Sequence, residues 1–173
     1  MLFRSDGVSV RREVYRRAPK LVLRQTGDRP VATIDRGGVT FGRSVIGITA
    51  ESECDLLWLA ALLNSTPFAA LYRAVAPEAG RPFAQVKVGK LKIVPVPPVG
   101  EGGLAELAAR MLSERDEDSR RELMAAIDRA AARAYGLSES DVQHVAQWIC
   151  ATDRAAAATP PQPAGTSSAR PGR

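Results

Sequence analysis

The hydrophobic positions in the first third of the chain follow the pattern of β-strands. Residues 20–25 (KLVLRQ) form a short apolar run, and the turn-forming residues 26–30 (TGDRP) close it. A second apolar run returns after that turn, as in a hairpin, and further runs rich in β-branched residues follow another turn. The pattern therefore predicts three or four short strands, in a mixed or antiparallel sheet, at residues 20–25, 31–34, 39–41 and 45–49.

The spacing of apolar residues then becomes helical. The leucine-rich run 55–64 has the period of a buried helix, and Ser65 or Thr66, followed by Pro67, is placed to cap a second helix. Residues 100–103 are rich in glycine and indicate a linker. Beyond this linker, helical spacing predicts three more helices at residues 104–111, 119–135 and 138–150.

Two local signals mark the ends of these last helices. Ser138 and Asp141 have the spacing of a capping box, with Asp in place of the usual Glu or Gln. Gly136 is placed to end the preceding helix, because glycine adopts the left-handed conformation that follows many helices.

Lysines alternate with apolar residues between the two halves of the chain. Lys87, Lys90 and Lys92 are interleaved with valine, leucine and isoleucine, and the run 93–98 contains three prolines. Because proline cannot donate a ladder hydrogen bond, this run predicts an edge strand that leads into an extended exit.

Together these elements predict an α+β fold, in which a small mixed β-sheet with packed helices precedes a C-terminal helical subdomain. We place the first domain at residues 1–98 and the helical subdomain at residues 99–151. Residues 152–173 consist mostly of Ala, Pro, Ser, Gly and Arg. Such a segment buries too little apolar surface to fold, so we expect a disordered tail there.

Composition adds a charge asymmetry to this outline. The 173 residues carry a formal net charge of +5. Residues 1–98 contain 15 basic and 8 acidic residues, whereas residues 99–173 contain 9 basic and 11 acidic residues. The positive half is therefore the half that holds the predicted sheet.

Residues that support catalysis or metal binding are sparse. Cys54 and Cys150 lie far apart in the sequence, and we expect two buried thiols rather than a disulfide or a zinc site. His144 is the single histidine and has no paired nucleophile, so we expect no catalytic residue, no cofactor and no metal. No apolar stretch reaches the roughly 18 residues of a membrane span, which favours a cytoplasmic protein without membrane contact.

Four segments, taken in order, resemble one known family. They are residues 19–29 (PKLVLRQTGDR), 31–35 (VATID), 62–65 (LLNS) and 91–97 (LKIVPVP). In this order they resemble the TaqI-like C-terminal specificity domain, the target-recognition region of adenine-specific DNA methyltransferases in type IIG restriction-modification and BREX-like phage-exclusion systems. Residues 127–138 are similar to the closing helices of such enzymes, so the resemblance extends over about residues 15–150.

The sequence departs from those enzymes where their chemistry lies. Their catalytic domain carries a glycine-rich S-adenosylmethionine loop and an Asn-Pro-Pro-Tyr-type motif, and the 173 residues contain neither. The run 95–98 (PVPP) has no asparagine and no aromatic residue to hold a flipped adenine. We therefore expect no enzyme activity from this chain alone. Either a catalytic subunit acts in trans, or the chain is a split or truncated reading frame.

The resemblance and the chemistry of DNA recognition indicate two groups of contact residues. Arg and Gln make bidentate contacts with base edges, so we expect a hairpin group to read sequence: Arg24, Gln25, Thr26 and Arg29. A second group is expected to form a strip that faces phosphates: Lys87, Lys90 and Lys92, with Arg73, Arg81 and Gln85 nearby. The simpler interpretations are a solvated turn and an edge strand kept soluble by lysines.

The arginines that precede the sheet are either a flexible arm on DNA or solvated charge: Arg11, Arg12, Arg16 and Arg17. The sequence thus predicts a specificity module that binds double-stranded DNA and acts with a catalytic methyltransferase or restriction subunit. Two alternatives stay open. One is a protein-interaction module whose helices bind a partner and whose positive charge is incidental, and the other is an inactive fragment of a larger methyltransferase.

Overall fold

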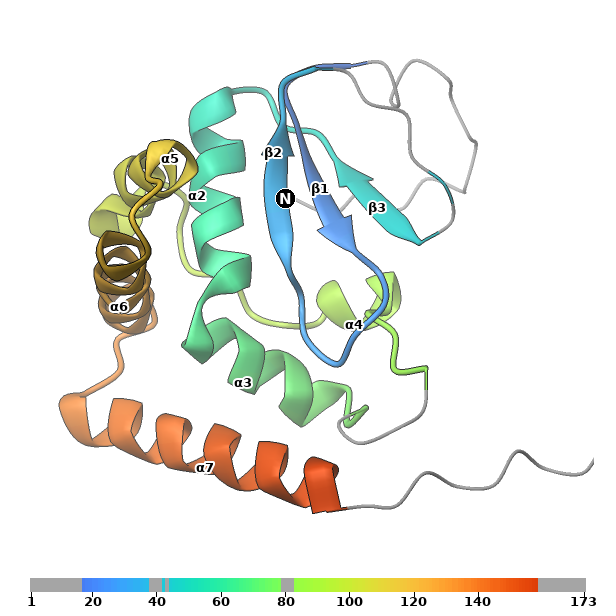
Figure 1. Cartoon of the computed structure of the whole chain (residues 1–173), viewed down its shortest axis with the longest axis vertical. Helices are drawn as coiled ribbons and strands as arrows, with labels where there is room; N and C mark the ends of the chain where they lie inside the picture. Colours follow the sequence, from blue (N-terminus) through green and yellow to red (C-terminus); the bar gives the residue numbers. More distant parts are fainter. Residues whose placement is uncertain (1–16, 38–41, 43, 79–82, 159–173) are drawn as a thin grey trace, which may run out of the picture.

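The computed structural model describes residues 17–37, 42, 44–78 and 83–158 (Figure 1). Three short strands pair in the order β2-β1-β3, and both pairings are antiparallel, which confirms the α+β class and shows that the small sheet is not mixed. The strand predicted at 39–41 lies outside the described residues. The strands are β1 (Lys20–Arg24), β2 (Ala32–Asp35) and β3 (Val45–Ile48).

β1 is the central strand, and its alternating residues decide which face of the sheet is covered. Leu21 and Leu23 are fully buried in the core, whereas Arg24 is exposed. Lys20 is also buried, and its Nζ forms an ion pair with Asp35, which lies opposite it on β2. Because a buried cation needs such a partner, Lys20 is a structural residue of the sheet.

A single residue separates the two helices that follow the sheet. α2 spans Glu53–Asn64, α3 spans Thr66–Val75, and the chain bends by 69° between them. The buried Ser65 hydroxyl donates to Leu62 O (2.7 Å) and accepts from the Phe68 N–H (3.3 Å). Ser65 therefore ends α2 and caps α3, which confirms the predicted cap.

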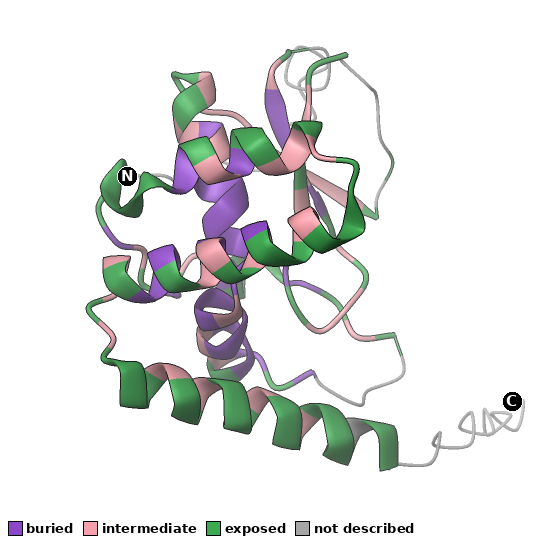
Figure 2. Cartoon of the chain, turned by 60° about the vertical axis from the view of Figure 1, so that its left-hand side comes forward, coloured by how far each residue is buried: buried purple, intermediate pink, exposed green. Residues whose placement is uncertain are grey.

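Two helices cover the side of α2 that faces away from the sheet (Figure 1). They are α5 (Leu104–Ser113) and α6 (Glu117–Ala134), and their apolar residues join the same continuous core as the sheet. A further helix, α7 (Glu139–Ala158), runs along α3 at the outside of the molecule. Most of the α7 surface is exposed (Figure 2). The three predicted C-terminal helices are thus present.

The caps predicted for these helices are confirmed as well. Gly136 follows α6 with a φ of +68°. The Ser138 N–H donates to the Asp141 carboxylate (2.9 Å), and the Asp141 N–H donates to the Ser138 hydroxyl (3.2 Å). This reciprocal pair is the capping box that begins α7.

α7 is longer than predicted. It continues to Ala158, so the disordered tail expected from Thr152 is wrong for residues 152–158. The alanines in this stretch have the highest helix propensity of any residue, and they extend a helix that is already packed on α3. The remainder of the predicted tail, residues 159–173, lies outside the described residues.

The segment predicted as an edge strand is not a strand. Residues Val88–Leu91 form a short helix, α4, and residues 93–98 have no regular structure. Buried positions occur here at every third residue, at Leu91, Val94 and Pro97, and not at every second one. The prolines also remove ladder donors, so the alternation of lysine and apolar residues did not indicate strand geometry.

The glycine-rich segment predicted as a linker packs against two helices. It forms a single 3-10 turn, η1 (Glu101–Gly103), and Glu101 O accepts a hydrogen bond from Trp58 Nε1–H (3.0 Å). A Cβ at Gly102, which has a φ of +80°, would lie 3.0 Å from Ala130 O of α6. The close approach of this turn to α6 therefore requires glycine.

Both cysteines are exposed, so the expectation of two buried thiols is wrong. On α7 the half-buried residues Val142, Val145 and Ile149 form one stripe, and Cys150 falls outside it.

No single described helix is long and apolar enough to cross a membrane. α2 and α3 meet that criterion only as a bent pair, and most of their residues are buried in the core.

Candidate nucleic-acid interface

A pairing with a distant segment of the chain extends the end of β1. Thr26 and Gln85 form an antiparallel bridge, flanked by hydrogen bonds from Gly27 N–H to Ala84 O (2.8 Å) and from Val86 N–H to Gln25 O (2.7 Å). We call residues 24–27 and 84–87 the paired tip. It brings together five of the eight predicted contact residues: Arg24, Gln25, Thr26, Gln85 and Lys87.

Four of these five side chains are exposed, and Gln25 is half-buried. The Arg24 side chain folds across the turn that follows it. Its Nη2 lies 3.0 Å from the position that a Cβ on Gly27 (φ +133°) would take. Glycine at this position thus admits the guanidinium over the turn backbone. Arg24 has no ion-pair partner in the part of the chain that the structure describes. Its five donors are therefore directed to solvent or to a ligand.

Lys87, by contrast, is held by two contacts. Its main-chain N–H donates to Tyr72 Oη (2.9 Å), and its Nζ forms an ion pair with Glu78 Oε1 (2.7 Å). Burial raises the pKa of the Tyr72 hydroxyl, which stays protonated as the acceptor of that bond. Glu78 is buried, so the Lys87 ammonium already has a fixed counter-charge. A phosphate group would have to compete with Glu78 for it.

The other two predicted lysines lie on α4 and directly after it. Lys90 is exposed, and Lys92 is half-buried at the end of the helix. Among the described residues, neither ammonium group has a hydrogen bond or an ion pair. Within the part of the chain that the structure describes, the predicted cations without a counter-charge are therefore Arg24, Arg29, Lys90 and Lys92. Unpaired cations of this kind bind phosphate with the least competition.

Arg73 joins three elements and does not extend the lysine strip. The residue is 6% exposed, and its Nη2 contacts Asp28 (2.6 Å) after β1 and Asp153 (2.8 Å) on α7. Nη1 donates to Thr152 Oγ1 (3.3 Å). The two carboxylates compensate the buried guanidinium. Contrary to the sequence-based expectation, Arg73 is not available to a phosphate.

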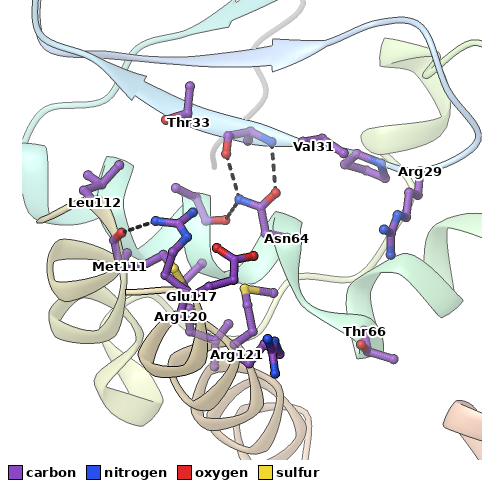
Figure 3. A pocket seen from close by; sticks show the side chains of 17 residues that line it. Arg29, Val31, Thr33, Asn64, Thr66, Met111, Leu112, Glu117, Arg120 and Arg121 are labelled. Carbon is purple, nitrogen blue, oxygen red and sulfur yellow. Dashed lines mark hydrogen bonds between the residues drawn. The ribbon is translucent and has the colours of Figure 1, made fainter. Parts of the chain in front are cut away.

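Arg29 lines a different feature, a groove of about 740 Å³ between β2, α2, α5 and α6 (Figure 3). Arg120 and Arg121 also line it, but Arg120 donates to two main-chain carbonyls and Arg121 pairs with Asp118 (2.9 Å). The apolar lining includes Ala61, Met111, Met124 and Ile127. Arg29 is the single predicted contact residue in this lining, and it is not one of the residues of the paired tip.

Two polar residues that the site predictions omitted join neighbouring elements of the fold: Asn64 joins α2 to β2, and Asp128 joins α6 to α3. The Asn64 amide accepts from the Ala32 N–H (3.0 Å) and donates to Ala32 O (2.8 Å), and thereby satisfies the outer edge of β2 (Figure 3). Asp128 of α6 accepts from the N–H and the hydroxyl of Thr66, both at 2.7 Å, at the start of α3. Both lie in segments that carried the family resemblance, and no local pattern indicates these distant partners.

The described residues contain no group of three His, Cys, Asp or Glu side chains arranged to hold a metal ion. His144 is exposed on the outer face of α7. The features that the structure does assemble are the paired tip, the unpaired lysines on and after α4, and the groove beside β2.

These features define the class of the molecule: an α+β module whose sheet ends in an exposed polar and basic tip. The TaqI-like C-terminal specificity domain matches residues 4–96, which is more than half of the chain, and the chain belongs to this family. The match confirms the resemblance at the level of the family and ends before α5. No curated protein matches the sequence.

Proposed function

We propose that this chain is a target-recognition module that binds double-stranded DNA through the paired tip and α4. The observation that carries the proposal is the pairing of residues 25–27 with 84–86. It brings Arg24, Gln25 and Thr26 beside Gln85 and Lys87 of a distant segment, with Lys90 and Lys92 three and five residues beyond Lys87. Membership of the specificity-domain family supports the same function.

In the proposed mechanism, two kinds of contact do different work. Lys90 and Lys92 bind phosphate oxygens and fix the position of the module on the duplex, without regard to base sequence. Arg24, Gln25, Thr26 and Gln85 present donors and acceptors to base edges, where Arg recognises guanine and Gln recognises adenine by paired hydrogen bonds. The antiparallel pairing keeps these side chains on a rigid backbone, which limits the entropy lost on binding.

We further propose that methyl transfer is supplied by a separate catalytic subunit, within an adenine-specific methyltransferase of the type IIG or BREX-like kind, in the cytoplasm. The absence of a glycine-rich cofactor loop and of an Asn-Pro-Pro-Tyr motif from these 173 residues supports a non-catalytic role. Calorimetric titration of the chain with S-adenosylmethionine should then give no binding heat. Stoichiometric binding would contradict this part of the proposal.

Selection from a pool of random duplexes tests the recognition function. The wild-type chain, with its catalytic partner where one is identified, should enrich a defined sequence. Arg24→Ala and Gln25→Ala should lose about 1–3 kcal/mol of discrimination on that sequence, because a bidentate contact is lost only where the correct base is present. Arg110→Ala is the matched control, since Arg110 is exposed on α5, which packs on α2 and α6. Equal enrichment by all four proteins would contradict base reading by the tip.

The groove beside β2 favours a second candidate function, a protein-interaction module. Its methionines Met111 and Met124 provide an adaptable apolar surface of the kind that binds partner helices. A chain with this function alone would bind a protein partner and show no salt-dependent affinity for DNA.

A further inference from the structure

Phe83 is the most exposed large apolar side chain among the described residues. It is 91% exposed, and the next is Ile93 at 60%. Aromatic residues make up only 5% of the sequence, and the two tryptophans illustrate the usual placements, with Trp58 buried and Trp148 partly covered. A phenylalanine ring left almost wholly in water costs solvation free energy that burial against a ligand would recover.

The backbone at Phe83 is also unusual. Its φ is +61°, and it is the single non-glycine residue with a positive φ among those described. L-residues with a side chain adopt this region rarely, because Cβ crowds the backbone, and such residues concentrate at ligand-binding sites. The described residues leave the ring 91% exposed, so packing within the described part of the chain does not account for this conformation.

The position of Phe83 relates it to the paired tip. The residue lies one position before Ala84, whose carbonyl accepts the hydrogen bond from Gly27 N–H (2.8 Å). The Arg24 guanidinium lies over the same Gly27. The ring therefore projects from the pairing that also positions Arg24, and the backbone that follows it is fixed by the bridge between Gln85 and Thr26.

We propose that Phe83 stacks on the bases of the bound duplex, as a wedge at the edge of the paired tip. This inference rests on the proposed function. Basic side chains hold the phosphates, and an apolar ring beside them can enter a base step and partly unstack it, which exchanges contact with water for contact with base faces. The neighbouring Arg24 guanidinium favours a nucleic acid over an apolar protein surface as the occupant, because Arg24 would remain unpaired in an apolar interface.

Fluorescence of 2-aminopurine tests the proposal. The duplex selected by the wild-type chain carries 2-aminopurine at successive positions, and binding should brighten it at one step, where stacking is lost. Phe83→Ala should abolish the brightening and weaken binding about tenfold or more, whereas Phe83→Tyr should retain both. The salt dependence of binding should not change in either variant, since no charge is altered.

Controls separate this role from folding and from other apolar residues. Because the ring is 91% exposed, Phe83→Ala should unfold at the wild-type temperature. Val99→Ala removes another exposed apolar side chain, which is 46% exposed and lies beyond α4, and should leave the fluorescence unchanged.

The possible failures are distinguishable. Two results would overturn the stacking role and leave DNA binding intact. In one, the wild-type chain binds DNA in a salt-dependent manner but 2-aminopurine brightens at no position. In the other, Phe83→Ala binds DNA and brightens 2-aminopurine as the wild-type chain does. If Phe83→Ala retains DNA binding but loses the catalytic partner, the ring is a protein contact instead. If the wild-type chain shows no salt-dependent binding, the proposed function itself fails.

Discussion

At the scale of single residues, the charge of a side chain predicts its function less well than the presence or absence of a counter-charge. Lys20, Arg73 and Lys87 belong to the basic N-terminal half, and each is paired with a carboxylate of the same chain. Arg24 and Lys90 have no such partner among the described residues. The net excess of basic residues therefore overstates the number of side chains that are free to contact phosphate.

Lys90→Ala and Lys87→Ala should consequently differ in their effect on DNA binding. Loss of one free phosphate contact makes the slope of log Kobs against log salt shallower by about one unit. We expect this result for Lys90→Ala. Lys87→Ala should change the slope by clearly less, because Glu78 already neutralises Lys87 (2.7 Å). Fluorescence anisotropy at several salt concentrations measures both. Equal slopes for the two variants would show that the ion pair with Glu78 does not compete with DNA.

Asn64 makes a separate prediction, about stability. Asn64→Ala leaves the N–H and the carbonyl of Ala32 without their partner, removes the additional bond to Ala60 O (2.8 Å), and should lower the free energy of unfolding by about 1–3 kcal/mol. Asn64→Asp keeps an acceptor for the Ala32 N–H but loses both donated bonds, so it should also destabilise. Urea denaturation measures the difference. Wild-type stability in both variants would mean that water replaces the amide at no cost.

At the scale of elements, α7 shows how distant contacts override local composition. Its last two turns have the alanine-rich sequence of a tail, yet Thr152 and Asp153 contact the buried Arg73 of α3. These contacts supply one of the two carboxylates that compensate the Arg73 charge, and so they link the end of α7 to the turn after β1.

Truncation of the chain tests this role of α7. A chain that ends at Ala158 should unfold with wild-type stability, whereas one that ends at Ala151 should lose about 1–2 kcal/mol, because it lacks Thr152 and Asp153. Asp153 is more than half exposed, which keeps the expected loss below that of a fully buried ion pair. Thermal and urea unfolding of the two truncations provide the measurement. An unchanged stability in the shorter chain would show that Asp28 alone compensates Arg73.

At the scale of the whole molecule, local patterns predicted the elements better than their contacts. The alternation around Leu21 and Leu23 and the leucine spacing of α2 predicted strands and helices that are present, since burial of one face imposes that period. The pairing of Thr26 with Gln85 joins segments with no common local pattern, and the groove has walls from four elements. The alternation of lysine with apolar residues before α5 led to the wrong prediction of an edge strand, because only every third side chain is buried there.

The same distinction applies to the candidate site. The sequence, with its family resemblance, selected side chains that are able to contact DNA, and the tip brings five of them together. The sequence alone did not indicate that Glu78 pairs with Lys87, that Arg29 lies at the groove, or that Phe83 is exposed. These facts depend on three-dimensional surroundings, which no single segment encodes.

The salt dependence of DNA affinity in the wild-type chain shows whether the paired tip and α4 bind DNA. With Lys90 and Lys92 on phosphates, the slope of log Kobs against log salt for a duplex should be about −2 or steeper, at roughly 0.9 per neutralised phosphate. The double variant Lys90→Ala with Lys92→Ala should make the slope shallower by about two units, whereas Arg110→Ala should leave it unchanged. A wild-type slope near zero, or a double variant that binds as wild type does, would contradict the assignment of this face to DNA.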